Sequence, residues 1–370
     1  MSKEFTPSKS LAAPKTTIGV VGWLRQNLFS SPLNTVLTLV FSYLTISILY
    51  QVLDWALISA QWQGSTRKAC ESSSGIAYHG ACWVFIKERF WQFMFGRYPA
   101  SEYWRMFLII AIIAVGVSLL LIKQNKHKAV TGLLMLTLFP LIAFYLLSGG
   151  VFGLEYVPTD KWGGLSLTLI IAAVGMTVSF PLGIILALGR RSKMPIARTL
   201  SISFIEFVRG VPLITILFMA SVMIPLFLPE EVNFDKLLRA LIGISLFQSA
   251  YMAEVVRSGL QGISKGQYEA ANSMGFNFTK GMTLIIMPQA LKLVIPGIVN
   301  TFITLFKDTS LVYIIAIHEL LKVTELSIVD PYWLGFYVEG YVFAALIYWM
   351  FCFGMSKYSI HIEKKLHTGH

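Results

Sequence analysis

Residues 165–188 read LSLTLIIAAVGMTVSFPLGIILAL, a run without a single charged side chain. A helix needs about 20 consecutive apolar residues to cross the hydrocarbon core of a bilayer, so this run predicts a membrane-spanning helix. The whole chain has the same character, because 55% of its 370 residues are apolar and only 13% are charged. A soluble domain carries roughly 25% charged residues. This composition argues against a soluble fold and excludes a disordered chain and a coiled coil.

Further apolar stretches lie on both sides of this run. They cover residues 33–60, 104–122, 129–147, 203–228, 237–256, 282–305 and 337–353. The first stretch is too long for the core of a signal peptide, so we interpret it as an uncleaved first span. The sequence thus predicts an all-α polytopic membrane protein with about eight transmembrane helices.

The formal charge of +11 is distributed unevenly among the connections. Lys and Arg are concentrated in the N-terminal tail and in the connections 123–128 and 190–198. Basic segments of this kind stay in the cytoplasm. The acidic connections are 148–164, 229–236 and 307–336. We expect these acidic connections on the outer side of the membrane, which places both termini in the cytoplasm. The loop 61–103 is also expected on the outer side, and because it is basic it departs from this charge pattern.

Four parts follow along the chain. They are a cytoplasmic tail at 1–32, three transmembrane helices at 33–160, five helices at 161–357 and a cytoplasmic tail at 358–370. The second part contains the large periplasmic loop 61–103, where Cys70 and Cys82 can either pair in an oxidising compartment or stay free. Cys352 is expected to be a small apolar filler in the last span. We predict no metal site, since the His318-Glu319 pair lacks the second His of a zinc-binding HExxH motif.

Residues 264–275 read SKGQYEAANSMG and lie between two predicted spans. Ser264 followed by Gln267 is a capping-box pattern, and Gly275 provides a residue at which a helix can stop. A helix of about ten residues is therefore expected in a cytoplasmic loop. From spacing alone, a solvated amphipathic connector is the favoured explanation of this helix.

The same segment carries a motif. It reads YEAA at 268–271, is followed by Gly275, and is followed later by IMPQA at 286–290. This pattern resembles the EAA motif of permease subunits of ATP-binding cassette (ABC) importers, with Met287 where Leu is common.

Other strings narrow the resemblance to the permeases of the polar amino acid uptake family. They are GLSLTL at 164–169, LGRRS at 188–192, FIEFVRGVPL at 204–213 and KDTSL at 307–311. The resemblance covers residues 162–357. The three preceding helices are similar in layout to the longer general L-amino acid permeases of Gram-negative bacteria.

The resemblance implies that 161–357 is a five-helix permease core in the bacterial inner membrane and that 264–275 is its coupling helix. The residues implied at the contact with a cytoplasmic ATPase are Tyr268, Glu269, Ala270, Ala271, Gly275 and Pro288. ATP and Mg would be bound by this ATPase dimer, and the chain itself would bind no cofactor. It would not be an enzyme, and it has no G-x-x-x-x-G-K-[ST] phosphate-binding loop.

The resemblance also implies further partners. They are a second permease subunit, a sister chain rather than an identical one, and a periplasmic amino acid-binding protein. No nucleic-acid partner is expected. The chain would move polar L-amino acids from periplasm to cytoplasm by alternating access.

Two groups of polar residues are candidates for the gate or the substrate path. Glu206 and Arg209 are three residues apart on one helical face before Gly210 and Pro212, and they form either a structural ion pair or a brace for an inner gate. Glu254 and Arg257 repeat this spacing and are interpreted as mainly structural. The second group is Lys307, Asp308, Thr309 and Ser310. Its charges and hydroxyls suit a zwitterion, and they suit the end of a helix equally well.

Two other classes of membrane protein compete with the importer. A secondary transporter driven by an ion gradient is the alternative, although we find no inverted repeat relating the two halves. A membrane-embedded enzyme would need convergent acid, base or metal ligands within the spans. The amino acids carried and the identity of the second permease subunit stay open.

Overall fold

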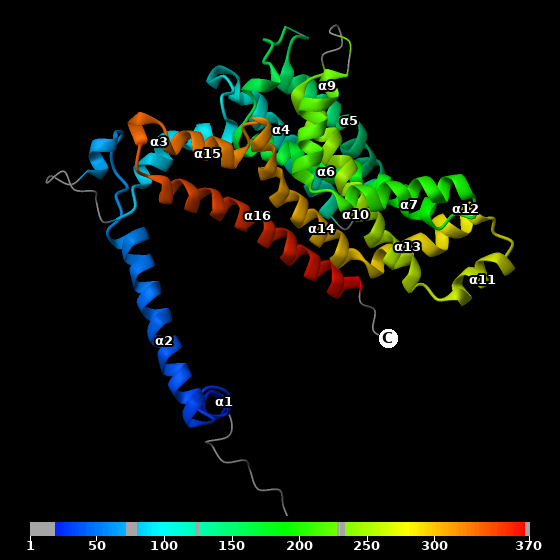
Figure 1. Ribbon diagram of the computed structural model, residues 1–370, viewed down its shortest axis with the longest axis horizontal. Helices are drawn as coiled ribbons and strands as arrows, with labels where there is room; N and C mark the ends of the chain where they lie inside the picture. The colour runs from blue at the N-terminus through cyan, green and yellow to red at the C-terminus, as the bar shows by residue number, and fades with distance from the viewer. Residues whose placement is uncertain are drawn as a thin grey trace, which may run out of the picture. The chain divides into compact units, whose positions relative to one another are not determined.

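The computed structural model describes residues 19–71, 80–122, 126–151, 153–227, 229 and 234–366. The chain divides into two compact units, Met1–Val84 and Phe85–His370. The described secondary structure of both units is helical apart from isolated bridges (Figure 1). This confirms the predicted all-α class.

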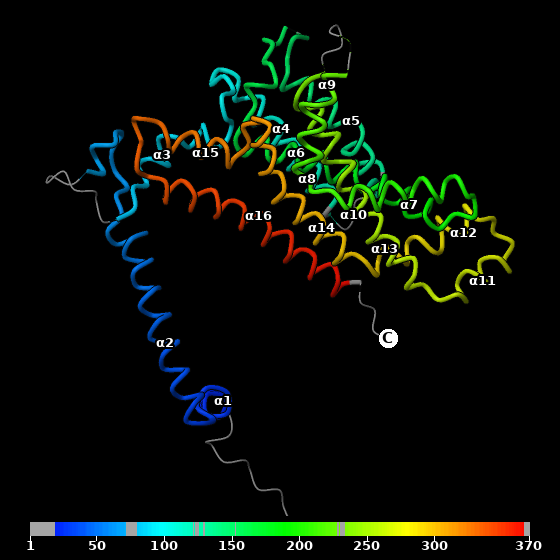
Figure 2. The backbone as a smooth tube through the Cα atoms, in the orientation of Figure 1, coloured from blue at the N-terminus to red at the C-terminus, as the bar shows by residue number. Residues whose placement is uncertain are grey.

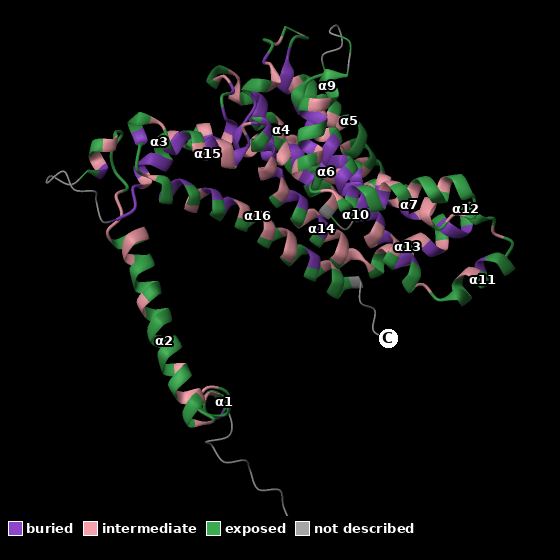
Figure 3. Cartoon of the chain, in the orientation of Figure 1, coloured by how far each residue is buried: buried purple, intermediate pink, exposed green. Residues whose placement is uncertain are grey.

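The first unit contains one long apolar helix, α2 (Pro32–Leu53). The other elements of this unit are α1 (Gly19–Asn27), the π-helix η1 (Asp54–Ile58) and the 3-10 helix η2 (Arg67–Cys70). The hydroxyl of Ser31 accepts a hydrogen bond from the Asn34 amide, and Pro32 occupies the first turn of α2, where no amide hydrogen is needed. None of the residues of α2 is buried (Figure 3). Such a surface suits lipid.

A disulfide closes the described part of the loop that follows. Cys70 and Cys82 are bonded to each other, so of the two alternatives left open by the sequence the structure has the paired one. Gln61 pairs with Ala81 and Trp83 through backbone hydrogen bonds, and the indole of Trp83 donates to the Ala56 carbonyl at 2.8 Å. The described residues at the two ends of this loop are therefore held together next to the end of the first span.

The second unit carries the remaining helices. The long ones are α3 (Trp83–Phe95), α4 (Tyr103–Leu121), α5 (Lys128–Ser148), α6 (Gly164–Arg190), α7 (Pro195–Gly210), α10 (Lys236–Gly262), α14 (Ile295–Asp308) and α16 (Tyr337–Leu366). Shorter pieces are η3 (Ala100–Glu102), η4 (Thr159–Lys161), α8 (Leu213–Phe218), η5 (Met219–Met223), α9 (Ile224–Leu226), α11 (Lys265–Ser273), α12 (Phe278–Gly281), η6 (Met282–Ile286), α13 (Met287–Leu293), η7 (Thr309–Ile315), α15 (Leu320–Ile328) and η8 (Pro331–Trp333). The predicted outer loop 61–103 thus contains a helix of its own, α3.

Six helices in the described part of the chain are long and apolar enough to cross a membrane, and a seventh is obtained if one bent pair is counted. This number is roughly consistent with the eight that the sequence predicts. Two predicted bounds were wrong. The stretch predicted at 203–228 begins earlier, at Pro195, and is sharply bent, since α7 and Leu213–Leu226 meet at an angle of 104°. The span predicted at 282–305 instead covers Ile295–Ile315.

The helices α6, α10 and α14 form the centre of the second unit (Figure 2). Helices α6 and α10 are parallel, because Gly175 approaches Ile244 and Gly183 approaches Met252. A Cβ at Gly183 would come 2.6 Å from the Met252 Cγ, so only glycine allows this close approach. Helix α14 runs antiparallel to α10, since the Gln248 amide donates to the Thr301 carbonyl at 2.7 Å and Gly259 lies against Val294.

These directions define two ends of the bundle. Arg190, Gly262 and Ile295 lie at the end from which α11 projects, which we call the α11 end. Gly164 and Ile315 lie at the opposite end, next to α15, which we call the α15 end.

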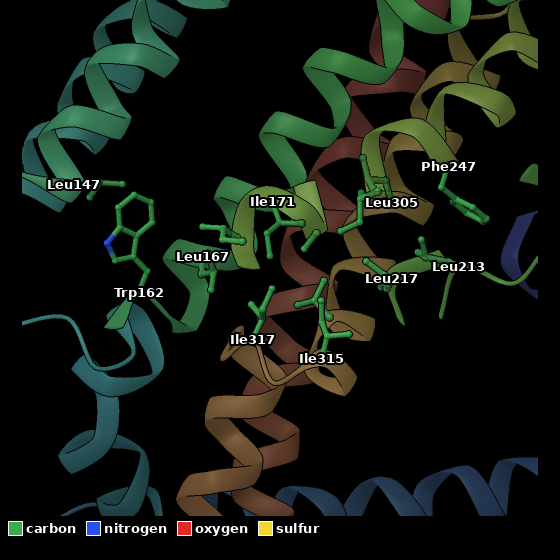
Figure 4. Close-up of a cluster of buried hydrophobic side chains, with 14 of the residues drawn as sticks. Leu147, Trp162, Leu167, Ile171, Leu213, Leu217, Phe247, Leu305, Ile315 and Ile317 are labelled. Atoms are coloured by element: carbon green, nitrogen blue, oxygen red, sulfur yellow. The ribbon is translucent and has the colours of Figure 1, made fainter. Parts of the chain in front are cut away.

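Two clusters of buried apolar side chains hold the helices together. The first includes Leu167, Ile171, Leu217, Leu305 and Ile315, which converge from α6, α8, α14 and η7 (Figure 4). The second lies toward the α11 end. It includes Ala187, Ile205, Met252, Val256 and Ile286. The core therefore extends to the base of α11.

Candidate functional site

The segment with the YEAA motif forms the short helix α11 at one end of the second unit (Figure 1). Gly275 follows with φ +77°, a left-handed conformation that suits glycine and ends the helix. The predicted capping box was wrong in its side-chain contacts, because no side-chain hydrogen bond caps Ser264. The Gln267 side chain instead accepts a hydrogen bond from the Gln289 amide at 3.2 Å.

The motif residues divide between two faces of α11. Glu269 and Ala270 are exposed, whereas Ala271 is 5% exposed and packs near Gly281. Met274, one helical turn after Ala270, is 73% exposed, and so is Phe278 of α12. An acidic side chain, a methyl group and two large apolar side chains are thus left uncovered in this segment, which is the composition of a protein contact.

Tyr268 fastens α11 to the bundle. Its hydroxyl donates to the Leu260 carbonyl of α10 at 3.0 Å and accepts from the Arg191 guanidinium at 3.2 Å. The Arg191 guanidinium also lies 5.5 Å from the centre of the Tyr268 ring. Arg191 directly follows α6, so one side chain connects α11 with the ends of both central helices.

The second half of the motif lies in the return from α11 to the bundle. Pro288 is in the first turn of α13, where proline is tolerated, and it is exposed. Ile286 and Ala290 on either side of it are fully buried in the second apolar cluster. The motif therefore alternates between residues that anchor the segment and residues that face outward.

A cluster of five charged side chains lies near the base of α11. Its centre is Glu254 of α10, which accepts hydrogen bonds from Arg257 Nε at 2.9 Å and from Arg190 Nη1 at 2.9 Å. Arg209 Nη1 lies 3.8 Å from the same carboxylate, and Arg190 also donates to Glu206 at 2.8 Å. We call Arg190, Glu206, Arg209, Glu254 and Arg257 the Glu254 cluster. It joins the ends of α6, α7 and α10.

One predicted pairing was wrong. Glu206 and Arg209 do not pair with each other within the described contacts: Glu206 pairs with Arg190, and Arg209 lies over the Tyr251 ring at 5.6 Å. The pair Glu254 and Arg257 forms at 2.7 Å, as its spacing predicts. The role of Arg190 was not predicted from the sequence, because its partners Glu206 and Glu254 are 16 and 64 residues away.

The second predicted group lies at the α15 end, remote from Glu206 and Arg209. The hydroxyls of Thr309 and Ser310 donate to the Phe306 and Lys307 carbonyls at 2.7 and 2.8 Å. Lys307 is exposed and Asp308 is half-buried. Only the two charged side chains of this group are thus directed away from the helix backbone.

Glu319 was missed by sequence reasoning as a structural residue. It is fully buried and accepts hydrogen bonds from the Leu321 and Lys322 amides at 2.8 Å and from the Tyr348 hydroxyl at 2.9 Å. Burial raises the pKa of Glu319 to about 7, and the hydrogen bonds from the two amides oppose this increase. Its position directly before the apolar run of α15 is the signal for a helix cap that the sequence contained.

Comparison with known proteins identifies the family. The model for the binding-protein-dependent transport system inner membrane component matches residues 179–366. The chain is 54% identical over 347 residues to the inner membrane amino-acid ABC transporter permease protein YhdY of Escherichia coli strain K12, covering 94% of this chain and 93% of that protein.

A second relative is similar along nearly its whole length. The chain is 38% identical over 421 residues to the glutamate/glutamine/aspartate/asparagine transport system permease protein BztC of Rhodobacter capsulatus, covering 97% of this chain and 96% of that protein. A solved amino acid ABC transporter with histidines aligns with a TM-score of 0.49 and 29% identity, over 55% of this chain and 92% of that chain. The sequence matches confirm the family predicted from the YEAA motif. The chain therefore belongs to the binding-protein-dependent transport system inner membrane components and, within them, to the amino-acid ABC transporter permeases.

Proposed function

We propose that this chain is the transmembrane permease subunit of an importer that moves polar L-amino acids from the periplasm to the cytoplasm. Hydrolysis of ATP, with its Mg, belongs to a separate cytoplasmic ATPase dimer, and the permease itself binds no cofactor. The observation that most directly supports this proposal is that α11 exposes Glu269 and Ala270 while Tyr268 binds it to α6 and α10. A helix held in this way can be displaced by a bound partner and can transmit the displacement to the bundle.

The ATPase contact is assigned to the exposed motif residues. Glu269, Ala270 and Gly275 face away from the bundle, and Met274 and Phe278 extend the same surface. Ala271 and Tyr268 set the position of this surface from below, and Pro288 begins the return helix beside it. The ATPase would close on ATP, move two coupling helices together and thereby favour the outward-open state of the permease.

The Glu254 cluster is the proposed link to the inner gate. Since it joins the ends of α6, α7 and α10, these ends would move as one body when α11 is displaced. In this proposal, the membrane crossing would begin after the bend at Gly210–Pro212, directly beyond Arg209. Glu206 and Arg209 would thus brace the backbone on the cytoplasmic side of the gate.

Charge and the disulfide support the proposed orientation of the chain. Cytosolic disulfides are rare, so Cys70 and Cys82 support a periplasmic location of the loop 61–103. The α11 end, with Arg190, Arg191 and Arg198, is basic and belongs on the cytoplasmic side. The chain is accordingly assigned to the inner membrane with both termini in the cytoplasm.

The substrate class is polar L-amino acids, delivered by a periplasmic binding protein. The name of one relative includes glutamate, glutamine, aspartate and asparagine, and these four are the first substrates to test. Lys307, Asp308, Thr309 and Ser310 stay candidates for the substrate path, with the two charged side chains as the groups that would contact a zwitterion. A second permease subunit, a sister chain, would complete the pore.

Co-purification tests this proposal. The C-terminally tagged chain is solubilised gently from native membranes as wild type, as Glu269→Arg, and as the control Glu363→Arg, which changes an exposed glutamate on α16. We expect an ATPase and a second permease with the wild type and the control, and loss of the ATPase with Glu269→Arg. Recovery of the wild-type chain alone in several mild detergents, with ion-gradient-driven uptake in vesicles, would replace the proposal by the secondary-transporter alternative.

A further inference from the structure

A small recess lies at the α15 end of the second unit. It is lined by η4, by the first turn of α10 and by residues 316–318, and its volume is about 190 Å³. Its floor is apolar, since Trp162, Leu167 and Ile317 are each buried. Sites for drug-sized ligands measure roughly 300–1,000 Å³. The recess therefore suits a small molecule.

Two opposite charges line the recess without a partner in the described part of the chain. The carboxylate of Asp160 and the ammonium of Lys236 are both exposed, and neither makes a hydrogen bond or an ion pair to a described residue. The third charged lining residue, Asp235, is satisfied, because its carboxylate accepts from the Thr159 hydroxyl and from the Leu238 amide. One anion and one cation are thus available to a ligand.

The remaining ionisable group of the recess is His318. Its Nδ1 lies 3.1 Å from Arg97 Nη2, and its carbonyl accepts from the Gly164 amide at 2.9 Å. Burial, together with the nearby cations Arg97, Lys322 and Lys236, holds the pKa of His318 below its usual value. His318 is therefore neutral near pH 7 and leaves the balance between Asp160 and Lys236 unchanged.

The walls of the recess are fixed by contacts between distant segments. The Thr159 hydroxyl joins η4 to Asp235 at the start of α10, and Arg97 donates to the Asp160 carbonyl at 3.2 Å. Ala316 on the rim has φ +55°, the left-handed conformation that side chains other than glycine rarely adopt. Backbone held in this way is characteristic of sites that bind ligands.

We propose that this recess is an amino-acid site, in which Asp160 binds the α-ammonium group and Lys236 binds the α-carboxylate of a free L-amino acid. The inference rests on the proposed import function and adds to it a place where the substrate is held before it moves into the bundle. A docking site for the binding protein is the less favoured explanation. A stable protein contact covers about 800 Å² on each partner, whereas these charges line one small recess.

A cysteine reporter tests the site directly. Ala316→Cys, in a chain that also carries Cys352→Ala and keeps the Cys70–Cys82 disulfide, places a thiol on the rim of the recess in the complete reconstituted complex. We expect L-glutamine to slow the reaction of this thiol with a maleimide. Glutaramate, which lacks the ammonium group, and 4-aminobutyramide, which lacks the carboxylate, should not protect. Equal reaction rates with and without L-glutamine, L-glutamate, L-asparagine and L-aspartate would overturn the inference.

Transport variants provide the second test. Asp160→Asn and Lys236→Gln are compared with Glu155→Gln and Lys161→Gln, exposed neighbours that do not line the recess. Loss of one charged hydrogen bond should reduce uptake about tenfold in the first two variants and leave the controls unchanged. Docking of the purified binding protein should be equally strong in all four. If docking weakens in parallel with uptake, or if uptake matches the controls, the site is not an amino-acid site.

Failure of this inference and failure of the proposed function give different results. If wild-type proteoliposomes show no ATP-driven uptake of any of the four amino acids, the proposed function itself is wrong. If wild-type uptake is present and the reporter is not protected, only the recess is wrongly assigned.

Discussion

Tyr268 of α11 and Arg191 at the end of α6 are joined twice, by a hydrogen bond of 3.2 Å and by the guanidinium 5.5 Å from the centre of the ring. The same hydroxyl donates to the Leu260 carbonyl, so the tyrosine is held on both sides. Because α6 and α10 are the central helices of the bundle, Tyr268 links α11 to both of them. Coupling should therefore depend on the Tyr268 hydroxyl as well as on its ring.

Tyr268→Phe is expected to uncouple transport from ATP hydrolysis. The variant loses both hydrogen bonds of the hydroxyl and keeps the ring and its contact with Arg191, so the ATPase should still bind. Each lost hydrogen bond contributes about 1 kcal/mol, so the amino acid imported per ATP should fall severalfold. Uptake and phosphate release measured in the same proteoliposomes check this. Tyr358→Phe, at an exposed position on α16, is the control, and an unchanged ratio for Tyr268→Phe would contradict the role of the hydroxyl.

Glu254→Gln is expected to destabilise the protein more than Glu206→Gln. The Glu254 side chain is 16% exposed and faces three arginines, whereas Glu206 is 55% exposed and pairs with one. We expect a loss of about 1–2 kcal/mol for the first variant and less than about 0.5 kcal/mol for the second. Thermal unfolding of the solubilised protein measures both. Equal melting temperatures for the two variants would show that Glu254 is not the centre of the cluster.

The stability of the fold should depend on pH through Glu319. Its pKa is raised from 4.5 to about 7 in the folded chain, so between these values the folded state binds more protons than the unfolded state. The stabilising contribution is complete below about pH 4.5 and is lost as pH rises through about 7, with a total of up to about 3 kcal/mol.

Comparison with Glu319→Gln isolates this effect. The His318 pKa is lowered and opposes it, since a neutral histidine stabilises the fold above its pKa. Wild type and variant share His318, so the difference between their melting temperatures reports Glu319 alone. We expect the difference to change between pH 5 and 7.5. A difference that is constant over this range would mean that Glu319 does not titrate there.

The Cys70–Cys82 disulfide allows the orientation of the chain in the membrane to be tested. In intact cells, a maleimide that does not cross membranes should label these two thiols only after reduction by an impermeant reductant, because the loop 61–103 is assigned to the periplasm. Cys352, in the last span, should stay unlabelled. Labelling without reduction would contradict the disulfide, and labelling that requires permeabilised cells would reverse the assigned topology.

The same bond should also stabilise the loop. Its sequence separation of 12 residues corresponds to about 3 kcal/mol of loop-closure entropy in the unfolded chain. Replacement of both cysteines by serine is expected to increase proteolysis within residues 61–103 and to leave α11 and its ATPase contact unaffected. Limited digestion followed by mass spectrometry checks this.

Local patterns in the sequence were sufficient for much of the fold. Long uncharged runs such as 165–188 predicted spanning helices, since the bilayer leaves few alternatives for an apolar segment. The short helix α11 and its stop at Gly275 also follow from neighbouring residues. The bend after Gly210 was missed although Pro212 disfavours helix at the residue before it, because the apolar run 203–228 continues through both positions.

Contacts between distant segments were not predictable from spacing. Arg190 lies beyond the reach of any helical repeat from Glu206 and Glu254, so their pairing depends on how α6, α7 and α10 pack. From the sequence, Glu319 is one acidic residue among several in a polar connection. Its buried environment includes a hydrogen bond from Tyr348, 29 residues further on. The recess with Asp160 and Lys236 combines three segments that are separated in the chain and was not predicted either.

Uptake by the reconstituted complex tests the central claim most directly. The chain, its sister permease and the ATPase are placed in liposomes with ATP and Mg on the ATPase side and the binding protein with labelled L-glutamine on the other. We expect accumulation that requires both ATP and the binding protein, that persists when ion gradients are collapsed, and that Glu269→Arg abolishes while Glu363→Arg does not. Accumulation that follows an imposed ion gradient and continues without ATP would contradict the account.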